Sequence, residues 1–89
     1  MVNTITDFSA QVHDALDRRF SGAKIHVSRF SEGDRLNGYI IWSGFDEVEQ
    51  LDRQRRVYAA LREELQADAA KISIILAYSP DEWEAMHEE

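Results

Sequence analysis

The apolar positions near the start of the chain recur at helical spacing. Residues four positions apart share one face of a helix, and here they are Phe8, Val12, Leu16 and Phe20. Thr6 is a residue type that caps helix starts, and Gly22 can end a helix because glycine accepts a left-handed conformation. The pattern predicts a first helix over about 7–20.

Three later segments have the alternation or the β-branched and aromatic content of strands: KIHVSRF from Lys24, LNGYIIWS over 36–43 and KISIILAY over 71–78. The first two are separated by SEGD (31–34), whose residue types favour a turn. We therefore expect these two strands to form an antiparallel hairpin.

The segment between the second and third strands has an interrupted helical pattern. Val57, Leu61 and Leu65 are spaced by four, but every residue between Leu51 and Val57 is polar. A continuous helix would leave more than a turn of its core face without an apolar residue. The sequence therefore predicts a short helix over about 46–51 and a second helix, capped by Asp52, that ends near residue 67.

The third strand is followed by a strong helix start in SPDEWEAM. Ser79 and Glu82 have the spacing of a capping box, and Pro80 falls at the first helical position. Tyr78 and Trp83 can pack together as a hydrophobic staple across this start. A last helix is expected from Ser79 onward.

The predicted order is helix, strand, strand, helix, helix, strand, helix within a single domain, 1–89. The long connection between the second and third strands allows them to be parallel, with a right-handed crossover. The predicted class is α+β: a two-layer sandwich in which a three-stranded mixed sheet carries helices on one face.

Composition narrows the function classes. The chain has 17 acidic and 10 basic residues, a formal net charge of -7 and no cysteine, so it has no disulfide, thiolate or Cys-based metal site. The acidic balance argues against phosphate-driven binding of nucleic acid. No apolar run approaches the ~18 residues of a membrane helix, and the N-terminus lacks the pattern of a secretory signal, so we expect a cytoplasmic protein.

The titratable residues do not form a catalytic pattern. His13 is one helical turn from Asp17 and from Ser9, but two ligands do not close a zinc site and no oxyanion hole accompanies the serine. We expect neither an enzyme nor a bound metal or cofactor.

Two features are candidates for binding a partner. The first is the cluster Arg53, Arg55 and Arg56, which forms either a partner-binding patch or a solvated helix start balanced by the acids at 46–52. The second is the sheet, whose apolar runs place side chains on both faces; Ile40, Trp42 and Ile75 are its candidate interface residues. The alternatives are that the last helix or the loops cover part of the second face, or that isolated apolar residues are simply exposed.

The order and spacing of these elements resemble the BolA-like family, a relative of the type II KH fold. The family's central pattern resembles the positions Phe45, Arg53, Gln54, Arg55, Val57, Tyr58, Leu61, Glu63, Glu64 and Leu65, and its last helix start resembles Ser79, Pro80, Glu82 and Trp83. The resemblance covers nearly the whole chain. The chain departs from it at Gln54, where the family has a histidine between the two arginines.

The resemblance implies a protein-binding adaptor or regulator that partners a monothiol glutaredoxin, in iron–sulfur handling or stress response. In the family, a histidine at the start of the last strand, often with a Cys or His from the first hairpin loop, helps to hold a shared [2Fe–2S] cluster. Here Lys71 takes the first position, and the loop from Ser28 to Leu36 has neither residue. We predict Arg53, Arg55, Arg56 and Lys71 as partner-binding residues, and the resemblance falls on Arg53 and Arg55.

Two other functions stay open as alternatives. Nucleic-acid binding would suit a KH-like fold, but the GXXG loop that clamps the phosphate backbone is absent from the sequence. A homodimeric interaction module of unknown role is the third hypothesis.

Overall fold

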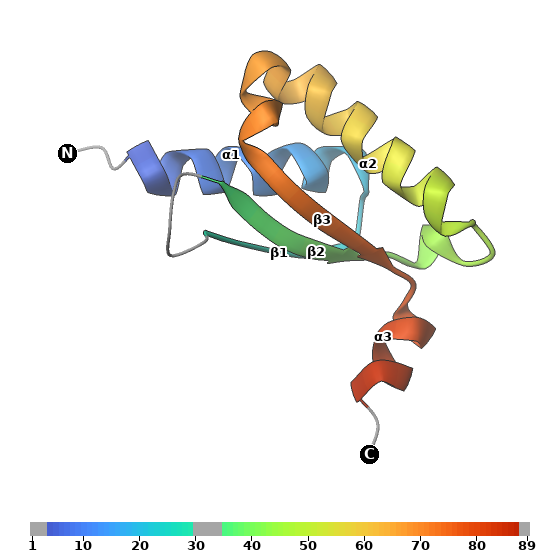
Figure 1. The fold of residues 1–89 in the computed structure, drawn as a ribbon. Coiled ribbons are helices and arrows are strands. Elements are labelled where there is room, and N and C mark those ends of the chain that lie inside the picture. The colour runs from blue at the N-terminus through green and yellow to red at the C-terminus, as the bar shows by residue number, and fades with distance from the viewer. Residues whose placement is uncertain (1–3, 30–34, 88–89) are drawn as a thin grey trace.

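The computed structural model describes residues 4–29 and 35–87, and the predicted turn at 31–34 lies outside these ranges. The described chain forms three α-helices, two 3-10 helices and three strands (Figure 1). In chain order they are α1 (Thr4–Arg19), β1 (Lys24–Arg29), β2 (Leu36–Ile41), η1 (Ser43–Phe45), α2 (Gln50–Leu65), η2 (Gln66–Lys71), β3 (Ile72–Tyr78) and α3 (Pro80–His87).

The three strands form one mixed sheet in the order β1-β2-β3. β1 and β2 are antiparallel, with Ile25 opposite Ile40, whereas β2 and β3 are parallel, with Tyr39 opposite Leu76. In Figure 1, α1 and α2 cover one face of this sheet, and α3 leaves the end of β3 toward the other side. The predicted α+β class, the hairpin pairing and the parallel crossover are confirmed.

The core lies between the sheet and the pair α1 and α2. Alternate strand residues point into it, and the helices add the residues of their apolar faces. Its fully buried large side chains are Phe45, Leu16, Leu36, Ile40, Leu61, Ile75, Val12 and Val57. No helix of the described ranges is long and apolar enough to cross a membrane.

Two helix boundaries differ from the prediction. Thr6 lies inside α1 and is therefore not its cap. The region 46–67 is not divided into two helices: one helix, α2, begins after Glu49, and Asp52 lies within its first turn. The core-facing side of α2 is occupied even in the polar interval before Val57, because Arg53 lies four residues before Val57 on that side and is only 5% exposed.

The start of α3 forms as predicted. The Glu82 backbone N–H donates to the Ser79 hydroxyl at 3.3 Å, and the Ser79 N–H donates to the Glu82 carboxylate at 3.0 Å, which is the reciprocal pair of a capping box. The rings of Tyr78 and Trp83 lie 5.5 Å apart across this start. α3 is thereby fixed to the end of β3.

Candidate protein-binding surface

The guanidinium of Arg53 joins three parts of the fold that are distant in sequence. It makes a two-pronged ion pair with Glu82 of α3, with N–O distances of 2.6 and 3.0 Å. Its Nε donates to the Val48 carbonyl at 2.7 Å, and one Nη donates to the Ala77 carbonyl at 3.3 Å. The guanidinium carbon also lies 5.8 Å from the centre of the Phe45 ring. We call Arg53 and Glu82 the clamp.

The contacts of Arg53 within the chain show that the prediction that it faces a partner is wrong. All three of its donor nitrogens are engaged within the chain, and the side chain is buried. Its charge is matched by Glu82, about thirty residues away in sequence, and not by the acids just before it. Arg53 therefore holds the start of α2 against the end of β3 and the start of α3.

The clamp also changes the acidity of Glu82. The hydrogen bonds from Arg53, and then that from the Ser79 backbone N–H, lower the pKa of the Glu82 carboxyl from 4.5 to about 2. Because the pKa is lower in the folded chain, ionised Glu82 stabilises the fold above the unfolded-state pKa. This contribution is lost as the pH falls from about 4.5 to about 2.

Glu82→Gln should therefore flatten the acid dependence of stability in that window. The Glu82 side chain is 47% exposed, so solvent screening reduces the contribution to about 1–2 kcal/mol at pH 7. Urea unfolding at pH 7 and pH 2.5 measures it, with Glu84→Gln as the matched control on α3. If the parent and Glu82→Gln lose the same stability between these pH values, the clamp does not ionise as described.

The other predicted basic residues, Arg55, Arg56 and Lys71, are exposed, and Lys71 lies apart from the two arginines. Arg55 is 3.7 Å from Asp52, so one of the predicted balancing acids does approach the cluster. Arg56 is exposed on the same helix. Lys71 lies beyond the far end of α2, a helix about 24 Å long at 1.5 Å per residue. The structure therefore does not bring Lys71 together with the arginines, and the partner-binding roles of Arg55, Arg56 and Lys71 stay predictions.

The residues predicted to form an interface on the exposed face of the sheet do not lie on that face as expected. Ile40 and Ile75 are fully buried beneath the helices, and Trp42 donates its indole N–H to the Ser21 carbonyl while packing on aromatic rings. The outward positions of β3 are instead Ile74 and Leu76, which are 42% and 39% exposed. The expectation that the apolar runs place side chains on both faces of the sheet holds for β3, but the helices cover Ile75 and not its neighbours Ile74 and Leu76.

The outer face of the sheet is partly covered by α3. Trp83 stacks on Tyr39 with ring centres 4.5 Å apart, and His26, which lies opposite Tyr39 on β1, stacks on it at 5.2 Å. α3 therefore covers one portion of this face, and Ile74 and Leu76 stay accessible. The use of this face by a partner stays a prediction.

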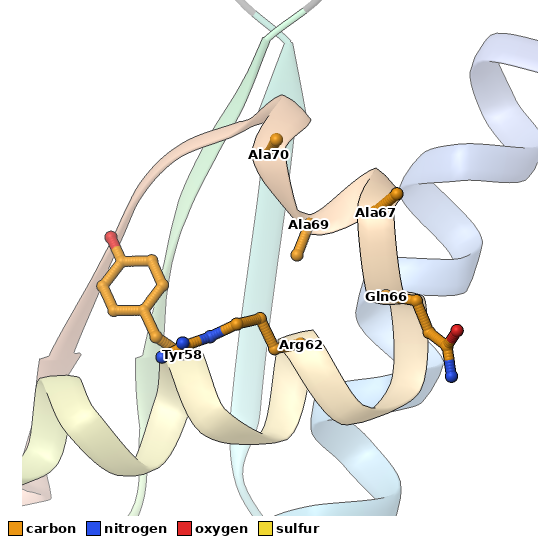
Figure 2. Close-up of a pocket in the computed structure, with 6 residues that line it drawn as sticks. All are labelled: Tyr58, Arg62, Gln66, Ala67, Ala69 and Ala70. Atoms are coloured by element: carbon orange, nitrogen blue, oxygen red, sulfur yellow. The ribbon is translucent and has the colours of Figure 1, made fainter.

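A hollow that the sequence analysis missed lies where α2 meets η2. It has a volume of about 410 Å³, and Figure 2 shows the six lining residues: Tyr58, Arg62, Gln66, Ala67, Ala69 and Ala70. The alanines leave the space open because their side chains end at Cβ. The signal in the sequence is QADAAK, a run of small residues directly after a helix. We call this space the α2–η2 hollow.

Metal-ligating residues do not gather in the parts of the chain that the structure describes, where no three His, Cys, Asp or Glu side chains form a potential site. His13 is closest to Asp14, at 3.7 Å, and not to the predicted Asp17. His87 lies 2.9 Å from the Trp83 carbonyl, one helical turn away.

Comparison with solved structures finds similar folds over almost the entire chain. A bol-like protein from Babesia bovis is 28% identical, with 99% of this chain and 96% of that chain covered and a TM-score of 0.68. A bolA protein homologue from Coxiella burnetii is 27% identical, with 94% and 99% covered and a TM-score of 0.63. BolA1 from Arabidopsis thaliana shares the fold at 23% identity and a TM-score of 0.69, with 92% and 98% covered. No family model and no curated protein matches.

Proposed function

We propose that this chain, a BolA-like protein, is a non-enzymatic adaptor that binds a protein partner. The observation that carries the proposal is the likeness to BolA-like structures across 99% of the chain. Arg55, Arg56 and Arg62 of α2 support it, because they are exposed and do not contribute to the core.

The surface proposed for binding is a stripe along the solvent side of α2. Residues three, four and seven apart share one side of a helix, and the stripe consists of Arg55, Ala59, Arg62 and Gln66. The acids next to Arg62 face elsewhere: Glu63 and Glu64 pair with arginines of α1 at 2.6–3.1 Å. Asp52 lies 3.7 Å from Arg55, so the unmatched positive charge of the stripe is that of Arg62. A positive charge on the surface of a chain whose net charge is -7 favours an acidic partner.

The partner that the family resemblance implies is a monothiol glutaredoxin. We propose this class of partner for the chain, in iron–sulfur handling or stress response. The proposal rests on the family and not on a contact in the structure, so it needs a direct binding experiment.

The residues present do not fit a [2Fe–2S] cluster. Lys71, at the position of the family's ligating histidine, has its ammonium 3.5 Å from Asp68 and 5.5 Å from the centre of the Phe8 ring. A lysine ammonium has no lone pair to offer iron, and the chain has no cysteine. We therefore propose an adaptor that binds its partner without supplying a ligand to a cluster.

Calorimetric titration with a monothiol glutaredoxin from the same organism tests this function. We expect binding to the cluster-free and the cluster-loaded glutaredoxin with similar affinity, and an unchanged visible absorption spectrum of the loaded form, because no new ligand is supplied. Absence of binding to both forms would rule out this partner. A shifted spectrum on binding, or a stoichiometric cluster in the isolated chain after anaerobic reconstitution, would contradict the cluster-independent role.

A further inference from the structure

The α2–η2 hollow combines the polar groups of Tyr58 and Arg62 with an apolar lining, whereas the Gln66 side chain points away from these two in Figure 2. Tyr58 and Arg62 project from one side of α2, one turn apart, and Gln66 lies where α2 passes into η2 (Figure 2). Ala67, Ala69 and Ala70 supply the opposite wall. In Figure 2 the Arg62 side chain runs along α2 in the direction of Tyr58.

The polar groups of the hollow match the chemistry of a carboxylate. A guanidinium only donates hydrogen bonds, and a phenol can donate one as well. No acidic residue lines the hollow, so none of these donors is matched by a carboxylate within it. Hydrogen bonds between a guanidinium and a carboxylate are about twice as strong as neutral ones, and their planar geometry gives specificity.

The charge of Arg62 is left unmatched by its neighbours. The adjacent acids Glu63 and Glu64 are held by Arg18 and Arg19 on the α1 side of α2. These contacts also lower the pKa of Glu64, which keeps it ionised beside α1. Among the described residues Arg62 forms no ion pair, so it can accept a carboxylate from outside the chain.

We propose that the α2–η2 hollow binds a Glu or Asp side chain of an acidic, extended segment of a protein partner. This proposal rests on the adaptor function and names the chemistry that the partner presents. Arg55 lies seven residues before Arg62 on the same stripe, which corresponds to about 10 Å along the helix. Three residues in polyproline II conformation cover about 9 Å and return to the same side of the chain, so a second acidic residue three positions away can approach Arg55.

The size of the hollow agrees with this occupant. A volume of about 410 Å³ lies near the lower end of the range of roughly 300–1,000 Å³ for ligand pockets. This volume is larger than a single ion requires, and it accommodates an acidic side chain with part of its backbone. The methyl groups of the alanines can contact the aliphatic part of that side chain.

The test is an NMR titration of the full chain with the peptide acetyl-Glu-Gly-Gly-Glu-amide. We expect backbone amide shifts concentrated at Tyr58, Gln66, Ala69 and Ala70, with a smaller response to the Gln-Gly-Gly-Gln peptide. Arg62→Gln should weaken binding about tenfold, the loss of one charged hydrogen-bonding group. Lys24→Gln is the matched control, because it removes a positive charge from an exposed position of β1, outside the stripe, and should leave the affinity unchanged.

Equal responses to the two peptides, or equal affinities for Arg62→Gln and the parent, would overturn the proposal. So would tighter binding of a single-stranded oligonucleotide than of the acidic peptide at the same residues.

The outcomes separate this proposal from the adaptor function. If glutaredoxin binds Arg62→Gln as tightly as the parent, the hollow is not its site and the adaptor function stands. If the peptide binds and glutaredoxin does not, the hollow stands and that partner is excluded.

Discussion

Arg53→Gln is expected to lower the free energy of unfolding by about 2–4 kcal/mol, because it breaks an ion pair and leaves buried carbonyls without a donor. The Val48 and Ala77 carbonyls and the Glu82 carboxylate all lose their contacts with the guanidinium. Glu82 is partly exposed and can be rehydrated, so the loss stays below that of a fully enclosed pair. In a domain of this size the melting temperature should fall by roughly 10–25 °C.

Arg56→Gln is the control, since it removes the same charge from an exposed position of the same helix. Its melting temperature should stay within a few degrees of the parent, as expected for an exposed arginine. Thermal unfolding followed by circular dichroism measures both variants. If Arg53→Gln has the same melting temperature as the parent, the clamp does not stabilise the fold, and Arg53 is better interpreted as facing outward.

The sequence predicted the strands and the cap of α3 because their signals are local. The capping box needs only Ser79 and Glu82, three residues apart, and both hydrogen bonds form. The role of Arg53 depends on Glu82, which lies 29 positions later in the chain. A pattern of apolar spacing cannot show that an arginine takes a core-facing position when its charge is neutralised by such a distant residue.

The register of the sheet and the missed hollow have a similar explanation. The runs around Ile40 and Ile75 are apolar on both faces, so alternation alone does not determine which face the helices cover. The packing of α1 and α2 decides it, and it leaves Ile74 and Leu76 outside. The hollow exists because alanines of η2 do not fill the space beside α2, a property of how two elements meet.

Gly38, in the middle of β2, was included in a predicted strand although glycine weakens strands. The structure gives the reason, which is a close approach of β1. Gly38 lies opposite Val27, and a Cβ atom added to it would be 2.0 Å from the His26 carbonyl oxygen and 3.0 Å from the Val27 Cα. Both are backbone atoms, so no rotation of a side chain can relieve the clash.

Gly38→Ala is therefore expected to destabilise the chain by about 3 kcal/mol or more, at the upper end of the usual range for added core volume, because two paired strands must separate. The melting temperature should fall by roughly 12 °C or more, measured by thermal unfolding as for Arg53→Gln. Asn37→Ala is the control on the same strand, since it removes only an exposed 3.0 Å contact with Ser28 and should cost less than about 1 kcal/mol. If Gly38→Ala melts no lower than Asn37→Ala, β1 and β2 are farther apart at this point than described. If it melts far lower, the glycine is required for the hairpin to lie against α1 and α2, and so for the α2 surface to form.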